Sequence, residues 1–311
     1  MQNNLAFIFP GQGSQSLAML ADFSDHEVVQ NTFSEASDAL GYDLWQLVQQ
    51  GPVEKLNQTN FTQPALLTAS VALWRLWQAS SSAKPAILAG HSLGEYSALV
   101  CAGVFSLADA VKLVEKRGEF MQASVPEGVG AMAAVIGLDD QSIIDACAQA
   151  ANEEVVSAVN FNSPGQVVIA GNKAAVERAG DLCKAAGAKR VLPLPVSVPS
   201  HCALMKDAAD KLAEEFQNIT FNEPTIAVVN NVDVAIESSV DAIKTALIKQ
   251  LYSPVRWTET IQHLANNGVE KALEIGPGKV LQGLLKRIDK TISCQSVNDN
   301  ASLTKALETV E

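Results

Sequence analysis

A serine between two glycines, directly after a short apolar run, limits the possible folds of this chain most. Residues 90–94 read G-H-S-L-G, residues 85–89 before them are typical of a buried strand, and residues 93–103 are typical of a closely packed helix. A strand that turns sharply into a helix needs glycine on both sides of the turn residue, because a Cβ would clash there. We therefore expect an exposed Ser92 hydroxyl, with N–H groups of the helix start aimed at whatever it attacks.

Strand and helix patterns alternate along almost the whole chain. This alternation favours an α/β fold with a mainly parallel sheet. Outside the middle of the chain, the expected strands are residues 5–9, 86–89, 225–229 and 271–275, and the expected helices are residues 28–40, 63–78, 107–123, 202–216, 240–251, 256–267 and 279–287.

The middle of the chain departs from this alternation and predicts a separate small unit. Its elements follow the order β-α-β-β-α-β, which is that of a ferredoxin-like fold. We therefore expect a large α/β domain from residues 1–126 and 197–311, with a ferredoxin-like subdomain inserted at residues 127–196. The expected strands of the small unit are residues 130–136, 155–159, 166–170 and 189–194, and its expected helices are residues 139–150 and 172–186.

Composition excludes several classes of protein. With 48% hydrophobic and 18% charged residues, the chain is typical of globular domains. Its 34 acidic and 22 basic residues give a net charge of −12, which argues against nucleic acid as a partner, since phosphate binding needs a basic face. No segment offers about eighteen uncharged apolar residues in a row, and the N-terminus lacks the basic region of a signal peptide. We expect neither a membrane span nor export.

The five cysteines are scattered and show no C-x-x-C spacing. We therefore expect no metal site and no disulfide framework, and a reducing cytoplasm as the compartment. The cysteines are Cys101, Cys147, Cys183, Cys202 and Cys294.

A serine nucleophile needs a base, and the chain has four histidines. His91 adjoins Ser92 and points to the opposite side of an extended strand, so we expect it to pack behind the turn. His26 lies in an acidic helix start, and His263 lies on an amphipathic helix whose polar face is exposed. His201 follows a proline-rich apolar stretch where the chain re-enters the large domain. By elimination it is the best base, with a purely structural role as the alternative.

Three further features leave alternatives open. Arg117 is either an exposed helix charge, which its position in V-E-K-R-G favours, or a guanidinium turned into a cleft to grip a carboxylate. Residues 9–15, F-P-G-Q-G-S-Q, invite a dinucleotide interpretation but lack its third glycine. They can instead bring a backbone N–H close to Ser92 as an oxyanion donor. Residues 276–279, G-P-G-K, lack the spacing of a phosphate loop and are interpreted as a strand-to-helix turn.

Several motifs together carry a resemblance to a known family. They are F-P-G-Q-G-S-Q at 9–15, T-Q-P-A at 62–65, G-H-S-L-G-E at 90–95, N-F-N-S-P-G-Q at 160–166, V-P-S-H at 198–201 and E-I-G-P-G at 274–278. In this order they resemble the bacterial malonyl-CoA:acyl carrier protein transacylases of type II fatty acid synthesis. The resemblance covers nearly the whole chain and implies a hydrolase-like α/β domain that carries an inserted ferredoxin-like subdomain.

The resemblance also implies catalytic roles. Ser92 would be the nucleophile and His201 its base. The family orients this histidine with the backbone carbonyl of a glutamine, a position that Gln250 matches. The backbone N–H groups of Gln12 and Leu93 would form the oxyanion hole.

The resemblance further implies the substrates. Arg117 would pair with the free carboxylate of a malonyl group, and Gln63 and Asn162 are candidates for the substrate pocket. The malonyl group would pass from malonyl-CoA through a malonyl-serine to the phosphopantetheine thiol of acyl carrier protein. We expect no bound cofactor, no membrane or nucleic acid partner, and a monomer.

Acyl carrier protein is acidic, so a basic patch would have to dock it. The two basic pairs that stand out are Lys286 with Arg287 and Lys189 with Arg190. The alternative is that all four are ordinary solvated charges.

Two competing functions fit part of the sequence. A serine esterase or thioesterase would place an aspartate between the serine and the histidine in chain order. Candidate aspartates exist there, but all of them fall inside the inserted unit: Asp139, Asp140, Asp145 and Asp181. A non-catalytic carrier-binding protein is the other alternative, and the presence of Ser92, His201 and Arg117 argues against it.

Overall fold

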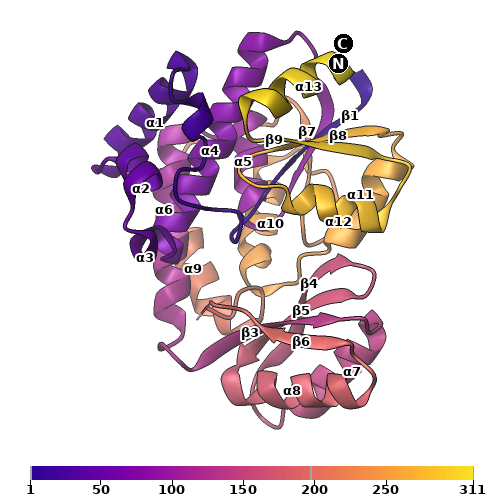
Figure 1. The fold of residues 1–311 in the computed structure, drawn as a ribbon. Helices are drawn as coiled ribbons and strands as arrows, with labels where there is room; N and C mark the ends of the chain where they lie inside the picture. The colour runs from indigo at the N-terminus through magenta and orange to yellow at the C-terminus, as the bar shows by residue number, and fades with distance from the viewer. Residues whose placement is uncertain (1, 197, 311) are drawn as a thin grey trace.

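The protein is built on two separate β-sheets that lie one above the other in Figure 1. The computed structural model describes residues 2–196 and 198–310. The first sheet has five strands in the order β7-β2-β1-β8-β9, and each pair is parallel. This confirms the predicted α/β class with a parallel sheet. Its strands are β1 (Gln2–Phe9), β2 (Pro85–Gly90), β7 (Ala227–Val229), β8 (Lys271–Ile275) and β9 (Ser293–Val297).

Strand β1 shows how the sequence places this sheet between two layers of helices. Leu5, Phe7 and Phe9 belong to one hydrophobic cluster, whereas Ala6 and Ile8 belong to another, as the two-residue period of a strand requires. On the first face, the indoles of Trp74 and Trp77 pack edge-on against Phe7, with ring centroids 5.6 and 5.3 Å away. The sheet is thus buried on both faces, which explains its continuous apolar runs.

Helices of the N-terminal half gather beside the first face, and two later helices cover the second (Figure 1). The first group comprises α1 (Glu27–Leu40), α2 (Leu44–Gln50), α3 (Val53–Leu56), α4 (Thr59–Ser80), α5 (Leu93–Cys101) and α6 (Leu107–Ser124), joined by α9 (Lys206–Glu215) and α10 (Val240–Tyr252). The second face carries α11 (Trp257–Asn266) and α12 (Val280–Ile288), and α13 (Asn300–Val310) follows β9.

The second sheet has four antiparallel strands in the order β4-β5-β3-β6. Two helices pack on one face around their own hydrophobic cluster, and the chain order β-α-β-β-α-β is the ferredoxin-like order that the sequence predicts. The elements are β3 (Gly130–Ile136), α7 (Asp140–Ala150), β4 (Val156–Ser163), β5 (Gln166–Asn172), α8 (Lys173–Ala185) and β6 (Arg190–Pro193).

The two parts are held together by backbone hydrogen bonds. Phe161 N–H donates to the Val255 carbonyl at 3.0 Å, and Val255 N–H donates to the Val159 carbonyl at 2.8 Å. The Thr258 hydroxyl adds a bond to the Phe161 carbonyl at 3.0 Å. These contacts fix the small sheet relative to the turn between β2 and α5.

Several elements differ from the expectations. The helix expected at 202–216 is split into a 3-10 turn (Ala203–Met205), α9 and a second 3-10 turn (Phe216–Asn218). Helices α2, α3 and α13, the 3-10 turn Ala21–Phe23 and the edge strand β9 were not expected. Strand β9 reads S-C-Q-S-V and α3 has four residues, so neither carries a clear apolar period.

No helix among residues 2–196 and 198–310 is long and apolar enough to cross a membrane. The same residues contain no cluster of potential metal ligands.

Candidate active site

Ser92 lies on a tight turn between β2 and α5. Its φ of 52° and ψ of −108° are unusual for a residue with a side chain. A Cβ on Gly90 would lie 1.9 Å from the Gly94 carbonyl carbon, and a Cβ on Gly94 would lie 2.0 Å from the Phe9 carbonyl oxygen. Both glycines are therefore required by close backbone approach. Phe9 and Gly90 are register partners on neighbouring parallel strands, so the loops after β1 and β2 meet at one edge of the sheet.

The Ser92 hydroxyl is paired with a histidine from a distant part of the chain. Ser92 Oγ and His201 Nε2 are 2.7 Å apart, and His201 Nδ1 lies 2.7 Å from the Gln250 carbonyl oxygen. A carbonyl only accepts, so Nδ1 carries the proton and Nε2 is left as the acceptor of the serine proton. Burial first, and then the positive charge of Arg117, lower the pKa of His201 to about 3. The imidazole is neutral at physiological pH and is placed to act as a base.

Two residues that line the cavity of Ser92 are candidates for backbone N–H donors. Gln12 follows β1, Leu93 is the first residue of α5, and both line the cavity around the Ser92 hydroxyl. Neither N–H donates to another residue in the described parts of the chain. The Gln12 side chain is fixed by a bond from Nε2 to Thr59 Oγ1 at 3.1 Å. The arrangement suits two donors that converge on a developing oxyanion.

Arg117 is buried beneath this cavity, with 2% of its surface exposed. Its Nη1 donates to Gln63 Oε1 at 2.8 Å, its Nη2 donates to Gln250 Oε1 at 3.0 Å, and Nη2 lies 3.5 Å from Ser92 Oγ. Its guanidinium carbon lies 5.3 Å from the ring centroid of Tyr96. The exposed helix charge that its sequence position favours is therefore wrong, because the helix turns this residue inward.

The positive charge of Arg117 has no direct ionic partner in the site. Among the described residues, no carboxylate oxygen lies within 4 Å of its guanidinium. Burial lowers the pKa of Arg117, but arginine remains charged in proteins. A buried cation that lacks a directly contacting carboxylate and lies next to a nucleophile is suited to a substrate that carries its own carboxylate.

The reactive cavity has a volume of about 120 Å³ and lies between the two sheets. Six of its thirteen lining residues are apolar and seven are polar or charged, so the groups that could act on a substrate lie beside apolar side chains. It is lined by Gln12, His91, Ser92, Leu93, Arg117, Met121, Met132, Asn160, Leu194, Val196, Val198, Ser200 and His201.

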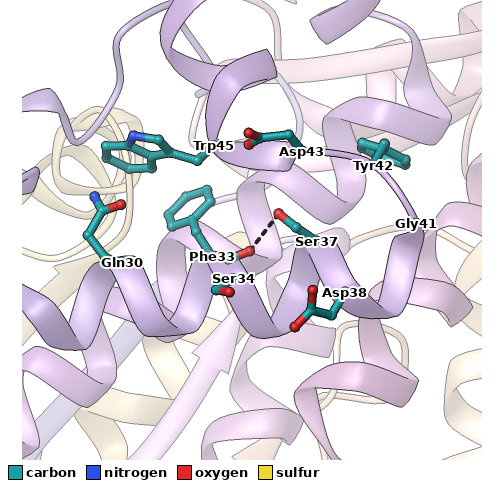
Figure 2. A pocket seen from close by; sticks show the side chains of 9 residues that line it. All are labelled: Gln30, Phe33, Ser34, Ser37, Asp38, Gly41, Tyr42, Asp43 and Trp45. Carbon is teal, nitrogen blue, oxygen red and sulfur yellow. Dashed lines mark hydrogen bonds between the residues drawn. The ribbon is translucent and has the colours of Figure 1, made fainter.

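A larger cavity of about 570 Å³ lies beside α1 and the loop that leads to α2 (Figure 2). Phe33, Tyr42 and Trp45 line it, and its Ser37 hydroxyl donates to the Phe33 carbonyl at 2.7 Å. No histidine is among its lining residues, so this cavity lacks the serine–histidine pair of the smaller one. Size alone does not locate the chemistry in this protein.

The remaining candidates for the substrate pocket lie next to the cavity. Gln63 is fully buried, and its Oε1 accepts the hydrogen bond from Arg117 Nη1. Asn162 Oδ1 accepts a hydrogen bond from His91 Nε2 at 2.8 Å, whereas Asn160 lines the cavity. His91 also packs edge-on against Trp257, with ring centroids 5.5 Å apart. His91 thus links the two sheets and also lines the reactive cavity, so the expectation that it packs behind the turn is wrong.

The four candidate docking residues gather at one end of the small sheet. Lys286 and Arg287 are exposed in the last turn of α12, and Arg287 Nη1 donates to Gln166 Oε1 at 2.7 Å. Gln166 and Arg190 pair with the same residue of β3 from opposite sides. Their backbones are thus about 10 Å apart, two strand spacings. Exposed Lys189 precedes Arg190, so the two basic pairs face solvent near each other.

Two residues of the site were not found from the sequence. Glu95 and Asn231 lie under the Ser92 turn and are almost completely buried. Glu95 stands in the G-H-S-L-G-E motif, and a carboxylate in the first turn of a helix expected to be closely packed indicates a buried polar contact. Asn231 carried no comparable signal, because its contacts with the turn cross more than a hundred residues of chain.

Comparisons with known proteins agree with this geometry. The family described as "Acyl transferase domain" matches residues 6–305. The chain is 66% identical to a malonyl CoA-acyl carrier protein transacylase of Escherichia coli (strain K12), over 97% of this chain and 98% of that protein. It is also similar to a crystal structure of an acyl carrier protein S-malonyltransferase from Vibrio cholerae, with a TM-score of 0.96, 65% identity, and 97% and 99% of the two chains covered.

A third relative is a structure of a malonyl-transacylase in complex with a type II PKS acyl-carrier protein. The TM-score is 0.97 and the identity is 64%, with 98% of this chain and 99% of that chain covered.

Proposed function

This chain belongs to the acyl transferase family, together with the malonyl CoA-acyl carrier protein transacylases, and from that premise we propose that it transfers a malonyl group from malonyl-CoA to acyl carrier protein in fatty acid biosynthesis. The enzyme is then an [acyl-carrier-protein] S-malonyltransferase. The observation that carries the proposal is the buried Arg117, 3.5 Å from the oxygen of a histidine-paired serine.

The first half-reaction acylates Ser92. His201 Nε2 removes the hydroxyl proton as Ser92 Oγ attacks the thioester carbonyl of malonyl-CoA. The carbonyl oxygen becomes an oxyanion that accepts hydrogen bonds from the Gln12 and Leu93 N–H groups, each worth roughly 3 kcal/mol. The C–S bond breaks, the imidazolium returns its proton to the departing thiolate, and a malonyl-serine ester remains.

The second half-reaction runs the same steps in reverse order on another thiol. His201 accepts the proton of the phosphopantetheine thiol of acyl carrier protein, and the sulfur attacks the ester carbonyl. Ser92 leaves as an alkoxide and takes the proton back, so no net proton is gained or lost. The two thiols use the site in turn, which is a ping-pong scheme.

A third cavity offers space for the pantetheine chain to which both thiols belong. It has a volume of about 790 Å³ and lies between α8 and the strands β3 and β6. Met132, Leu194 and Val196 line both this cavity and the reactive one, so the two adjoin. We propose that the pantetheine chain, common to coenzyme A and the carrier protein, enters along this side.

The wild-type protein can be tested directly with malonyl-CoA labelled in the malonyl group. We expect label on the protein after incubation with malonyl-CoA alone, and its movement to acyl carrier protein when that partner is added. An esterase would release most of the label as free malonate, and a non-catalytic binding protein would take up none. The partition of label between malonate and malonyl-thiol therefore separates the three functions.

Charge reversal at the basic patch is expected to weaken only the second half-reaction. The double variant Lys286→Glu and Arg287→Glu should lower kcat/KM for acyl carrier protein about 10-fold, because an acidic partner loses its steering field. Acylation of Ser92 by malonyl-CoA, measured as the burst of label on the protein, should change by less than about twofold. Equal losses in both half-reactions would contradict a docking role for this pair.

We keep four coarser expectations as proposals. A division into residues 1–126 with 197–311 and an inserted unit at 127–196 is supported by the separate hydrophobic cluster of the small sheet, although residue 197 lies outside the described residues. We further propose that the protein is a monomer, is located in the cytoplasm and works without a bound cofactor.

A further inference from the structure

Glu95 is a buried carboxylate under the nucleophile turn for which the acyl transfer steps have no task. It lies three residues after Ser92 in the first turn of α5, with 2% of its surface exposed. A buried carboxylate without a partner is costly, so its contacts indicate why the site retains it. It is not among the residues that line the reactive cavity.

One oxygen of Glu95 anchors two other residues. Glu95 Oε2 accepts a hydrogen bond from Asn231 N–H at 2.9 Å and another from Gln250 Nε2 at 2.8 Å. Asn231 then holds the turn from both sides: its Oδ1 accepts from Ser92 N–H at 2.7 Å, and its Nδ2 donates to the Gly90 carbonyl at 2.7 Å. The strained backbone of Ser92 is thereby fixed.

Gln250, the other residue that Glu95 binds, contacts Ser92, Arg117 and His201. Its Nε2 also donates to the Ser92 carbonyl at 3.0 Å, and its Oε1 accepts from Arg117 Nη2 at 3.0 Å. Its backbone carbonyl is the partner of His201 Nδ1. Because Glu95 holds the amide nitrogen, the amide oxygen must face the guanidinium. Serine, histidine and arginine are thus aligned by one glutamine, whose amide orientation depends on one carboxylate.

We propose that Glu95 is a positioning residue of the acyl transfer site: through Asn231 and Gln250 it aligns the Ser92 turn, His201 and Arg117, and its negative charge balances Arg117 until a substrate carboxylate takes over that task. This inference rests on the proposed function of the same site. It adds a specificity device, because the Glu95 charge and the malonyl carboxylate both stabilise the positive charge of Arg117, the first at a distance and the second by direct contact.

The charges around Glu95 set the direction of a pH effect. Burial raises the pKa of Glu95, and the hydrogen bonds from Gln250 and Asn231 and the charge of Arg117 lower it. Burial is the largest of these effects, so the resulting pKa is about 7. Tyr96 beside it stays neutral, since burial raises its pKa to about 12. Glu95 also lines a small cavity away from the reactive one, and Glu237 is another acidic residue in its lining. Glu95 is therefore charged above pH 7 and neutral below it. Malonyl-CoA should therefore bind more strongly below pH 7, where Glu95 is neutral and no longer stabilises the charge of Arg117.

The decisive variant is Glu95→Gln, which keeps an acceptor oxygen for both N–H donors and removes the charge. We expect its KM for malonyl-CoA at pH 8 to fall about three- to tenfold, with kcat within about threefold of wild type. The ratio of wild-type to variant KM should decline towards one between pH 8 and pH 6. Taking this ratio cancels the titration of coenzyme A itself.

Glu95→Ala removes both hydrogen bonds and should lower kcat about 10- to 100-fold, because two buried donors lose their acceptor. Recovery of kcat in Glu95→Gln then shows positioning. The matched control is Glu274→Gln, a buried carboxylate that accepts from Leu281 and Gln282 N–H at the start of α12, far from Arg117. Its KM should show no such pH dependence.

Two outcomes overturn the inference. One is a Glu95→Gln variant whose KM equals that of wild type at every pH, and the other is a Glu95→Ala variant that is folded and keeps wild-type kcat. If Glu95→Ala does not fold, the pH series with Glu95→Gln decides alone. A wild-type protein that takes up no malonyl label would instead contradict the proposed function, so the two failures are distinct.

Discussion

Ser92→Ala is expected to abolish the malonyl-enzyme and to lower kcat for malonyl transfer by about 10⁴- to 10⁶-fold. His201 Nε2 lies 2.7 Å from the Ser92 hydroxyl, so this oxygen can accept the acyl group while its proton passes to the imidazole. Intact-mass analysis after incubation with malonyl-CoA should show no adduct on the variant. Residual turnover would come from the oxyanion donors and binding alone.

The matched control is Ser200→Ala. Ser200 lines the same cavity as Ser92 but has no bond to a base. We expect this variant to form the adduct with a yield and rate close to wild type. An adduct that persists in Ser92→Ala and disappears in Ser200→Ala would place the nucleophile at the other serine.

Arg117→Ala is expected to lower kcat/KM for malonyl-CoA by about 10²- to 10³-fold, since breaking a buried ion pair costs about 3–5 kcal/mol. We expect acetyl-CoA to be a poor substrate of the wild type, because it leaves the guanidinium unpaired, and its kcat/KM should fall much less in the variant or should rise. The measurement is the ratio of kcat/KM for the two thioesters. An unchanged ratio in Arg117→Ala would show that Arg117 does not determine the preference for malonyl-CoA.

Part of this loss is expected in kcat, and not in KM alone. The charge of Arg117 is the second cause, after burial, of the low pKa of His201. A malonyl carboxylate on Arg117 offsets this charge, so it raises the pKa of His201 and makes it a better base. Acetyl-CoA does neither. Arg117→Lys keeps the charge without the planar fork and should restore part of the selectivity, while Arg75→Ala, at a surface pair with Glu35, should leave it unchanged.

The sequence was most informative where local geometry dictates the residue. The glycines at 90 and 94 are demanded by contacts that a Cβ cannot make, so the Ser92 turn could be predicted from five residues. The parallel sheet followed from continuous apolar runs, and the small sheet from its element order. Sequence alone gave His201 only by elimination, since its 2.7 Å contact spans 109 residues.

Other parts of the site could not be predicted, because tertiary packing decides them. Arg117 stands among Glu115, Lys116 and Glu119, which together are typical of an exposed helix face. Its burial depends on Gln63 and Gln250 from two other helices. Asn231 braces the turn from a loop after β7, and no period or motif announces that contact. Residues that act through distant partners need the fold to be known first.

The origin of the cavity walls has a consequence for how this enzyme can diversify. Met132, Asn160, Leu194 and Val196 come from the chain segment of the small sheet, whereas the groups that break and form bonds all come from the other part. Wall residues make none of the bonds that align Ser92, His201 and Arg117. Acyl-chain length can therefore drift in evolution, or be redesigned, by substitutions confined to one module, while the reactive centre is inherited intact from the other.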